Sequence, residues 1–333
     1  MSSVNTTVAV CDEKMVLALQ SSTFLHVSEL IMLILSVIAI PVLVVTMKKF
    51  VIAGVFHVNM RMIVAVHCLS ILMHCIGRII QHTSDFYLWV APIPICDKRS
   101  FLNWCLVSRS LYTFGIYCSS FTSVFVVIER TIATKLSKKY EDKKASIGIL
   151  LVLSQISLSV VITLFLYFGS VVPERPGYCF LNSRKDWSVF VELASMTANG
   201  LGLVQCLRIY TINIKLRTTF ALSDLSQKYQ IEENKTLSKA LLWFISLDFV
   251  FMTNYFLFSF LMETFYSDKA DAFFYAIFEL IHCVPVYALV VFPSMAKVLK
   301  SVHREKTVQL TAQVRVKDEA YFYYLKEQWT HRK

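Results

Sequence analysis

The sequence predicts an all-α membrane protein, a seven-transmembrane helix bundle with its N-terminus outside and its C-terminus in the cytosol. First, 56 % of the 333 residues are hydrophobic and 17 % are charged, with a mean hydropathy of +0.57, whereas a soluble domain needs a more charged surface. Second, seven apolar stretches are long enough to cross the ~30 Å hydrocarbon layer of a bilayer as helices. Third, lysine and arginine are concentrated in alternate loops, which sets the orientation.

The seven apolar stretches divide the chain into an extracellular N-terminus at residues 1–27, a seven-transmembrane domain at 28–296 and a cytosolic tail at 297–333. They show little alternation of polar and apolar residues and are too long to be strands of a membrane barrel. The expected spans, in order, are 28–47, 58–80, 104–128, 146–168, 188–212, 240–262 and 272–296.

Two of the spans contain residues that predict local features. In span 5, Gly200 and Gly202 predict the close approach of a neighbouring helix, because small residues let two backbones come together. In span 7, Pro285 and Pro293 each remove a backbone hydrogen bond. We therefore expect span 7 to be kinked near its inner half.

Basic residues are distributed unevenly between the two sides of the predicted bundle. The loops joining spans 1–2, 3–4 and 5–6, together with the tail, hold 24 of the 33 lysines and arginines, while the N-terminus and the other loops hold seven. By the positive-inside rule the N-terminus is outside. The sequon Asn5-Thr6-Thr7 is then open to glycosylation, and the sequon at Asn234 is not. The net charge of +10 therefore reflects loop bias and not nucleic-acid binding.

Four cysteines lie on the predicted outer side: Cys11, Cys96, Cys105 and Cys179. An even number in an oxidising compartment indicates two disulfides, and four cysteines allow three pairings. Cys105 opens span 3 and Cys179 lies midway along the loop between spans 4 and 5, so a bridge between them would hold that loop over the mouth of the bundle. Cys11 would then pair with Cys96. The alternative is that Cys11 or Cys96 is a free thiol.

Span 3 ends in an acidic and a basic residue side by side, Glu129-Arg130. Arg130 follows Cys105 by 25 residues, or about 37 Å of helix, so the two mark opposite rims of one span. An outside N-terminus, seven helices, a cysteine at the head of the third and an acid–arginine pair at its foot resemble G-protein-coupled receptors. The resemblance implies that Glu129 holds Arg130 in the inactive state and that Arg130 contacts the G protein on activation. The alternative is an ordinary ion pair at a membrane edge.

The wider pattern resembles the nematode serpentine chemoreceptors of the Sra superfamily. Cys11 and the stretch DFY at 85–87, which precedes Cys96, look most like class alpha-beta (Srab), although the sister classes Sra, Srb and Sre share much of the pattern. The segments that carry the resemblance are ERTIAT at 129–134 with YE at 140–141, FHVN at 56–59, LSQKYQ at 225–230 with EN at 233–234, and YF at 321–322 with Leu325 and Trp329.

This resemblance implies a plasma-membrane chemosensory receptor, on the cilium of a sensory neuron, that binds a small-molecule ligand and activates a heterotrimeric G protein. The receptor itself would carry no enzyme activity, cofactor or metal, and a receptor dimer stays open. Residues 215–239 are interpreted as a cytosolic extension of spans 5 and 6 that contacts the G protein together with Arg130.

The ligand is expected in the outer half of the bundle, because ionisable groups within spans are costly and usually face the interior. An Arg109–Glu279 pair could tie helices 3 and 7 together permanently, or an acidic or polar ligand could open it. The residues expected to border the cavity are Arg109, Tyr112, Glu192, Asn254, Glu279 and His282.

Other classes of membrane protein fit less well. A retinal protein needs a lysine in span 7, and 272–296 has none. A seven-span ligand-gated ion channel of the insect odorant-receptor type would place the N-terminus in the cytosol, against the distribution of basic residues. A membrane hydrolase could use His67, His74 and His282 as zinc ligands, but no carboxylate or cysteine is spaced to complete that site.

Overall fold

The computed structural model describes residues 11–49, 57–135, 145–167, 178–179, 185–219, 225–266, 271–301 and 304. For the helical residues 185–186, 217–219, 225–234 and 236 only the backbone is described. The sequon at Asn5, the lysine cluster of residues 136–144 and nearly all of the tail lie outside these residues. The described residues are helical and contain no strand, and seven helices are long and apolar enough to cross a membrane. The predicted all-α, seven-helix fold class is therefore confirmed, while the orientation of the termini stays a prediction.

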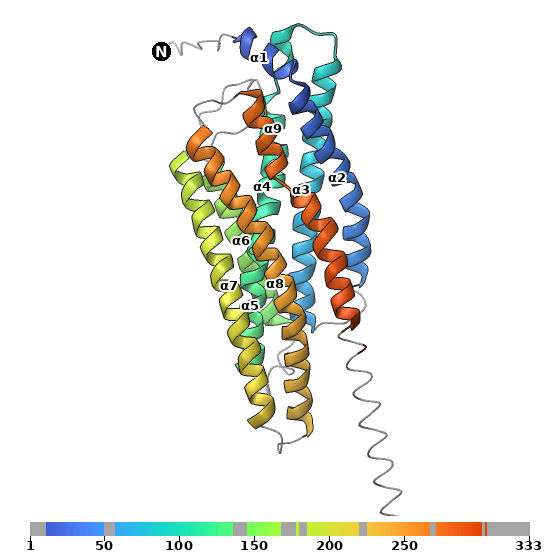
Figure 1. Cartoon of the computed structure of the whole chain (residues 1–333), viewed down its shortest axis with the longest axis vertical. Helices are drawn as coiled ribbons and strands as arrows, with labels where there is room; N and C mark the ends of the chain where they lie inside the picture. The colour runs from blue at the N-terminus through green and yellow to red at the C-terminus, as the bar shows by residue number, and fades with distance from the viewer. Residues whose placement is uncertain are drawn as a thin grey trace, which may run out of the picture.

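The helices run roughly parallel to one long axis, with α1 at one end (Figure 1). We call this the disulfide end, because Cys11–Cys96 and Cys105–Cys179 are bonded there, which is the pairing expected from the sequence. The elements are α1 (Glu13–Gln20), α2 (Thr23–Met47), α3 (Val58–Val90), η2 (Ile95–Lys98), α4 (Leu102–Ser120), α5 (Thr122–Lys135), α6 (Ser146–Tyr167), α7 (Lys185–Thr219), α8 (Leu225–Tyr266) and α9 (Ala272–Ile281).

Several helices are longer than the predicted spans. α2 begins at Thr23, where the hydroxyl of the N-cap Ser22 accepts a hydrogen bond from the amide of Leu25. α3 continues to Val90, ten residues beyond the apolar stretch that predicted it. α7 and α8 have 35 and 42 residues and extend past the other helices at the end opposite α1 (Figure 1). Hydropathy marked only the most apolar part of each of these helices.

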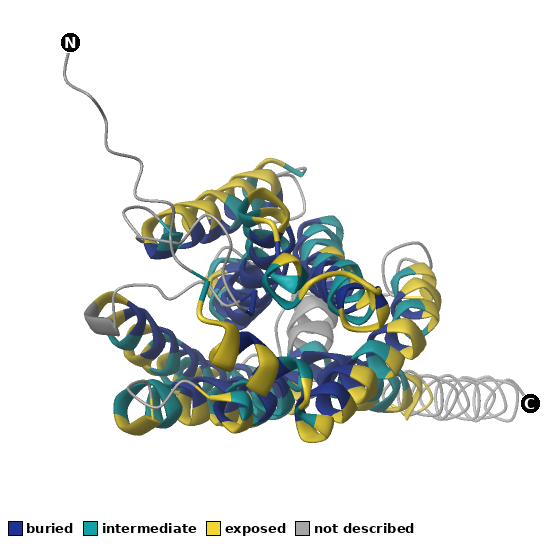
Figure 2. Ribbon diagram, turned by 90° about the horizontal axis from the view of Figure 1, so that it is seen from above, coloured by how far each residue is buried: buried dark blue, intermediate teal, exposed yellow. Residues whose placement is uncertain are grey.

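The outer surface of the bundle is apolar. Leu150, Leu164 and Leu201 on α6 and α7 are 63–65 % exposed. Seen from above, the buried residues occupy the helix faces turned toward the bundle interior, and the exposed residues the outer faces (Figure 2). An apolar exterior of this extent is expected of a protein whose solvent is the hydrocarbon of a bilayer.

The third span lies at the centre of the bundle. In its most apolar stretch 78 % of the residues are buried, against 28 % for α2 and for α6. α4 ends at Ser120 and α5 begins at Thr122, yet the amide of Phe121 still bonds the carbonyl of Tyr117 at 3.1 Å. The hydroxyl of Thr122 bonds the carbonyl of Cys118, a side-chain bond that commonly bends a helix.

Close approach of helices occurs at other glycines than those predicted. A Cβ at Gly200 or Gly202 would find its nearest neighbour at 3.6 or 3.9 Å, which is ordinary contact, so this expectation for span 5 is wrong. By contrast, a Cβ at Gly77 would lie 2.9 Å from the carbonyl oxygen of Ser108, and one at Gly115 would overlap the backbone of α3. These glycines allow α3 and α4 to pack backbone against backbone.

The seventh span is broken and not merely kinked. α9 ends at Ile281, residues 282–283 are not helical, and a second helical segment covers 284–301. The break comes just before Pro285, whose ring clashes with the carbonyl four residues earlier and which has no amide hydrogen. The predicted distortion is present, but it lies nearer the disulfide end than expected. Pro293 is accommodated inside the second segment.

Candidate ligand-binding and signalling sites

Glu279 on α9 is the centre of a buried charge cluster near the disulfide end. Glu279 is buried, with 2 % of the residue exposed. One carboxylate oxygen accepts from Arg78 Nη2 at 2.6 Å, and the other accepts from Arg109 Nη2 at 2.8 Å and from the Tyr178 hydroxyl at 3.0 Å. The structure thus contains the Arg109–Glu279 pair that the sequence raised as a possibility. It adds a second arginine, from α3, to the same carboxylate.

Arg78 also compensates for the break in the seventh span. At the break, the amide of Cys283 bonds the carbonyl of Ile281 at 2.7 Å and not that of Glu279, its partner in a regular helix. Arg78 donates to the freed carbonyl of Glu279 at 3.2 Å and to the carbonyl of His282 at 3.1 Å. One guanidinium therefore binds both the side chain and the exposed backbone of the broken helix.

Arg109 on α4 connects the same cluster to the Cys105–Cys179 disulfide. Its Nε donates to the carbonyl of Cys179 at 2.6 Å, which also accepts from Gln81 Nε2 at 3.2 Å. Its Nη1 bonds the hydroxyl of Tyr112. With Nη2 on Glu279 as well, every nitrogen of this guanidinium has a partner.

A cavity of about 60 Å³ opens beside this cluster, between α4, α6, α7, α8 and α9. Four of the six predicted residues line it: Arg109, Tyr112, Glu192 and His282. Glu279 lies behind Arg109 and bonds it without lining the cavity. Sequence reasoning did not include the other lining residues, which are Thr113, Tyr117, Leu166, Tyr167, Ser188, Tyr255, Glu263 and Phe278.

The prediction for Asn254 is wrong, because its side chain is exposed on the outer face of α8. Its amide donates to the carbonyl of Val250 at 2.7 Å, so its donor is satisfied within its own helix. The next residue, Tyr255, turns inward and places its hydroxyl 3.1 Å from Nε2 of His282. Neighbouring residues on a helix point about 100° apart, and at this position that difference separates the bilayer from the cavity.

The acidic side of the cavity is provided by Glu192. The residue is 4 % exposed, and its Oε2 has no hydrogen-bond partner among the described residues. A second carboxyl group, that of Glu263 on α8, also lines the cavity. Because the guanidinium of Arg109 already pairs with Glu279, Glu192 Oε2 is an acceptor at the cavity that Arg109 does not occupy.

A chain of polar side chains crosses the middle of the bundle below the cavity. His67 Nδ1 lies 3.0 Å from the hydroxyl of Thr122, and its Nε2 lies 2.8 Å from the hydroxyl of Tyr287. Tyr287 donates to Asp248 at 3.0 Å, and Gln155 donates to Thr122 at 2.9 Å. These contacts join α3, α5, α6, α8 and the 284–301 segment. The sequence offered His67 only as a possible zinc ligand, and these hydrogen-bond partners depend on the fold.

Glu129 and Arg130 lie on α5 at the end opposite α1. They are 0 % and 5 % exposed. Arg130 Nη2 donates to one oxygen of Glu129 at 2.6 Å, and its Nε donates to the other. Consecutive residues do not normally face each other on a helix, so the guanidinium folds back to make this two-pronged contact.

The three histidines considered for a zinc hydrolase lie in separate sets of contacts. His67 bonds Thr122 and Tyr287, His74 Nδ1 lies 3.0 Å from the carbonyl of Tyr112, and His282 lies beside Tyr255. Over the described residues, no group of three potential metal ligands includes any of these histidines.

Comparison with known proteins places these features in a receptor family. The family model described as "Serpentine type 7TM GPCR receptor class ab chemoreceptor" matches residues 10–330. Three proteins of Caenorhabditis elegans are similar. "Serpentine receptor class beta-6" is 21 % identical over 276 residues, which are 79 % of each chain.

The other two relatives are matched over a smaller part of their length. "Serpentine receptor class alpha/beta-14" is 26 % identical over 255 residues, which are 73 % of this chain and 64 % of the relative. "Serpentine receptor class beta-17" is 25 % identical over 199 residues, which are 57 % of this chain and 54 % of the relative. In these two cases the chain spans less than two thirds of the relative.

Proposed function

The chain belongs to the serpentine seven-transmembrane chemoreceptors of class ab, and we propose that it is a G-protein-coupled receptor that binds a small ligand in the cavity beside Arg109. It is a multi-pass membrane protein of a receptor family. The observation that carries the proposal is a cavity near the disulfide end, lined by polar side chains from several helices. Cavities between the helices of a bundle are common ligand sites.

The ligand we infer is small and carries a hydrogen-bond donor or a positive charge. A cavity of about 60 Å³ is well below the ~300–1,000 Å³ typical of sites for drug-sized ligands. Glu192 has a carboxylate oxygen without a partner among the described residues, whereas Arg109 is fully engaged. A small amine would satisfy Glu192 and place its apolar part against the tyrosines of the wall. An acidic ligand, one of the alternatives that the sequence left open, would have to displace Glu279 from Arg109.

Activation would follow from contacts between the cavity and the seventh span. His282 lines the cavity at the break of this span, and Tyr287 lies five residues further on in the polar chain with Asp248 and His67. A ligand that favours another position of the 284–301 segment would change these hydrogen bonds. By population shift, this would release Arg130 from Glu129 and open a G-protein surface beside the extensions of α7 and α8.

We place the disulfide end outside the plasma membrane, on a sensory cilium by analogy with the family. Disulfides form in oxidising compartments, and both lie at the end that carries α1. The expected result is that Asn5 is glycosylated and Asn234 is not. A glycosidase mobility shift should disappear in Asn5→Gln and persist in Asn234→Gln. Modification at Asn234 would show that the bundle has the opposite orientation in the membrane, and it would favour the ion-channel alternative.

Arg130→Ala is expected to reduce G-protein activation at least tenfold while leaving ligand binding unchanged. A panel of small primary and secondary amines, with the carboxylic acids of the same carbon skeletons, is screened on the wild type with a nucleotide-exchange reporter. We expect active compounds among the amines.

Glu129→Gln should raise basal activity, because it weakens the bond that holds Arg130.

Lys135→Ala is the matched control for Arg130→Ala, since Lys135 is an exposed basic residue later on the same helix. Normal signalling by Arg130→Ala, or an equal loss in Lys135→Ala, would contradict the role of Arg130. Activity restricted to the acids would contradict the ligand class and leave the receptor function standing.

A further inference from the structure

We propose that the receptor binds one divalent transition-metal cation of the zinc type between α2 and α3, with Glu29, His82 and Asp85 as ligands. One potential ligand atom from each of these side chains lies within 4.8 Å of the other two. The site is near the disulfide end and is separate from the cavity beside Arg109. It depends neither on the identity of the chemosensory ligand nor on the G protein.

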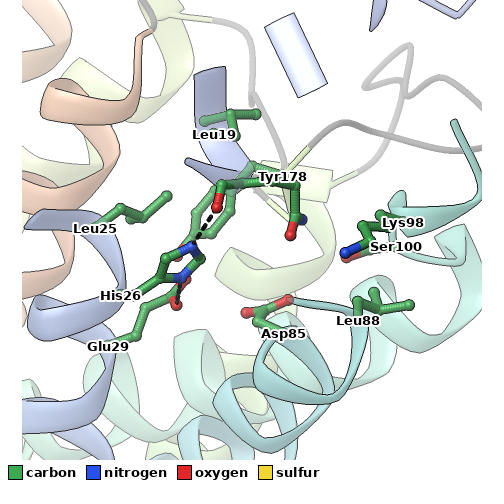
Figure 3. Close-up of a pocket in the computed structure, with 10 residues that line it drawn as sticks. Leu19, Leu25, His26, Glu29, Asp85, Leu88, Lys98, Ser100 and Tyr178 are labelled. Atoms are coloured by element: carbon green, nitrogen blue, oxygen red, sulfur yellow. Dashed lines mark hydrogen bonds and ion pairs between the residues drawn. The ribbon is translucent and has the colours of Figure 1, made fainter. Parts of the chain in front are cut away.

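The two carboxylates face a small polar cavity. Glu29 on α2 and Asp85 on α3 approach it from opposite sides, beneath Tyr178 (Figure 3). The cavity has a volume of about 20 Å³, which is space for a single water-sized occupant. A single small cation is therefore the largest occupant that this space admits without movement.

His82 points to a ligand, because it is buried and lacks hydrogen bonds. The residue is 1 % exposed, and neither of its ring nitrogens has a hydrogen-bond partner within the described part of the chain. Nδ1 lies 4.0 Å from Oδ2 of Asp85, an oxygen that also has no hydrogen-bond partner among the described residues. Buried polar groups nearly always have a hydrogen-bond partner. Two such atoms that face each other without one therefore indicate that a ligand binds between them. A metal ion would satisfy both atoms at once.

The spacing of the ligands supports this assignment. His82 and Asp85 are three residues apart on α3, so they lie on one face of the helix. The donors of a tetrahedral zinc site are about 3.4 Å apart, given bonds of ~2.0–2.2 Å. Small side-chain rotations would reduce the 4.0 Å between His82 and Asp85 to this value.

The surroundings also match those of a metal-binding histidine. Such a histidine usually donates its second ring N–H to a carboxylate, and Nε2 of His82 lies 3.7 Å from Oε2 of Glu279. On the other side, His26 Nδ1 lies 3.3 Å from Glu29, and its Nε2 lies 3.0 Å from the carbonyl of Gln20. His26 is therefore a positioning residue that orients Glu29.

Glu29 and Asp85 are the two carboxylates that line the cavity. Arg78 and Arg109 both pair with Glu279. Lys98 lines the cavity, but its ammonium group donates to the carbonyl of Trp89 at 2.9 Å. One imidazole and two carboxylates, with water in the fourth position, form a donor set suited to zinc. Calcium and magnesium prefer oxygen ligands alone.

Zinc binding to the full-length receptor in nanodiscs tests the proposal. The protein carries a tag without histidine and is first stripped with a chelator. Titration against a chromophoric zinc indicator should give one Zn²⁺ per receptor, and Co²⁺ should produce visible absorption bands typical of a tetrahedral site with nitrogen and oxygen ligands. Affinity should fall at least tenfold in His82→Gln and in Asp85→Asn, and by less in His26→Gln.

Glu13→Gln is the control, because Glu13 is an exposed carboxylate on α1 at the same end of the bundle. It should bind zinc as the wild type does. Wild-type receptor that shows no saturable zinc binding would overturn the proposal, as would His82→Gln and Asp85→Asn variants that bind normally. If these variants do not fold, the Co²⁺ spectrum of the wild type and its loss on adding chelator decide the question.

Discussion

Glu279→Gln is expected to lower the free energy of unfolding by about 3–5 kcal/mol, the usual cost of removing one partner from a buried ion pair. The substitution preserves shape but removes the charge that Arg78 and Arg109 share. Two buried guanidinium groups would then lack a counter-charge. Arg78 would retain its bonds to the carbonyls of the broken helix, so we expect a folded but much less stable receptor.

Thermal unfolding with a thiol-reactive dye measures this effect, because four of the free cysteines are buried and react only on unfolding. Glu13→Gln removes an exposed carboxylate and should change stability by less than about 0.5 kcal/mol. Adding Arg109→Met to Glu279→Gln removes one unpaired charge, so the double variant should lose less than the sum of the single losses. An unchanged melting temperature in Glu279→Gln would contradict the central role of this carboxylate.

The variant Cys105→Ala with Cys179→Ala is expected to lose about 4 kcal/mol of stability, from the entropy of a loop of this length in the unfolded chain. The bridge spans a sequence separation of 74 residues. It should also lose most of its ligand response. Without the bridge, the carbonyl of Cys179 is no longer held against Arg109 and Gln81, and the wall of the cavity is less well ordered.

The second disulfide provides a matched control for this result. Cys11 and Cys96 are 85 residues apart, so removing both by alanine should cost nearly the same free energy of unfolding. Neither residue lines the cavity beside Arg109. Thermal unfolding should therefore show similar losses for the two pairs, while the reporter response falls for the Cys105 pair alone. Equal losses of response would mean that overall stability, and not the cavity wall, limits signalling.

The sequence predicted the helices well because a bilayer demands long apolar helices whatever their neighbours. The seven predicted stretches each lie within a helical span of the structure or end within one residue of it. The ends of the helices were missed wherever a helix continues beyond its apolar stretch, as α3, α7 and α8 do. The ends of the helices depend instead on caps such as Ser22 and on polar residues that continue the helix after the apolar stretch.

The candidate site was predicted in part. Arg109, Glu192, Glu279 and His282 could be selected because ionisable groups in a span are costly and tend to face inward. Asn254 was misplaced because an amide can satisfy its donor within its own helix and then face lipid. Arg78 was not among the predicted residues, and its role at the break of the seventh span depends on carbonyls that only the folded chain exposes.

The sequence by itself thus determined that this protein is a bundle of seven membrane helices, and that its interior contains charged groups such as Arg109 and Glu279. Tertiary structure alone decided which helix faces meet, which glycines allow backbone contact and which partner each buried charge takes. The physical reason is the solvent. Lipid is as apolar as a leucine-rich interior, so hydropathy locates a membrane helix along the chain but does not distinguish its inner face from its outer one.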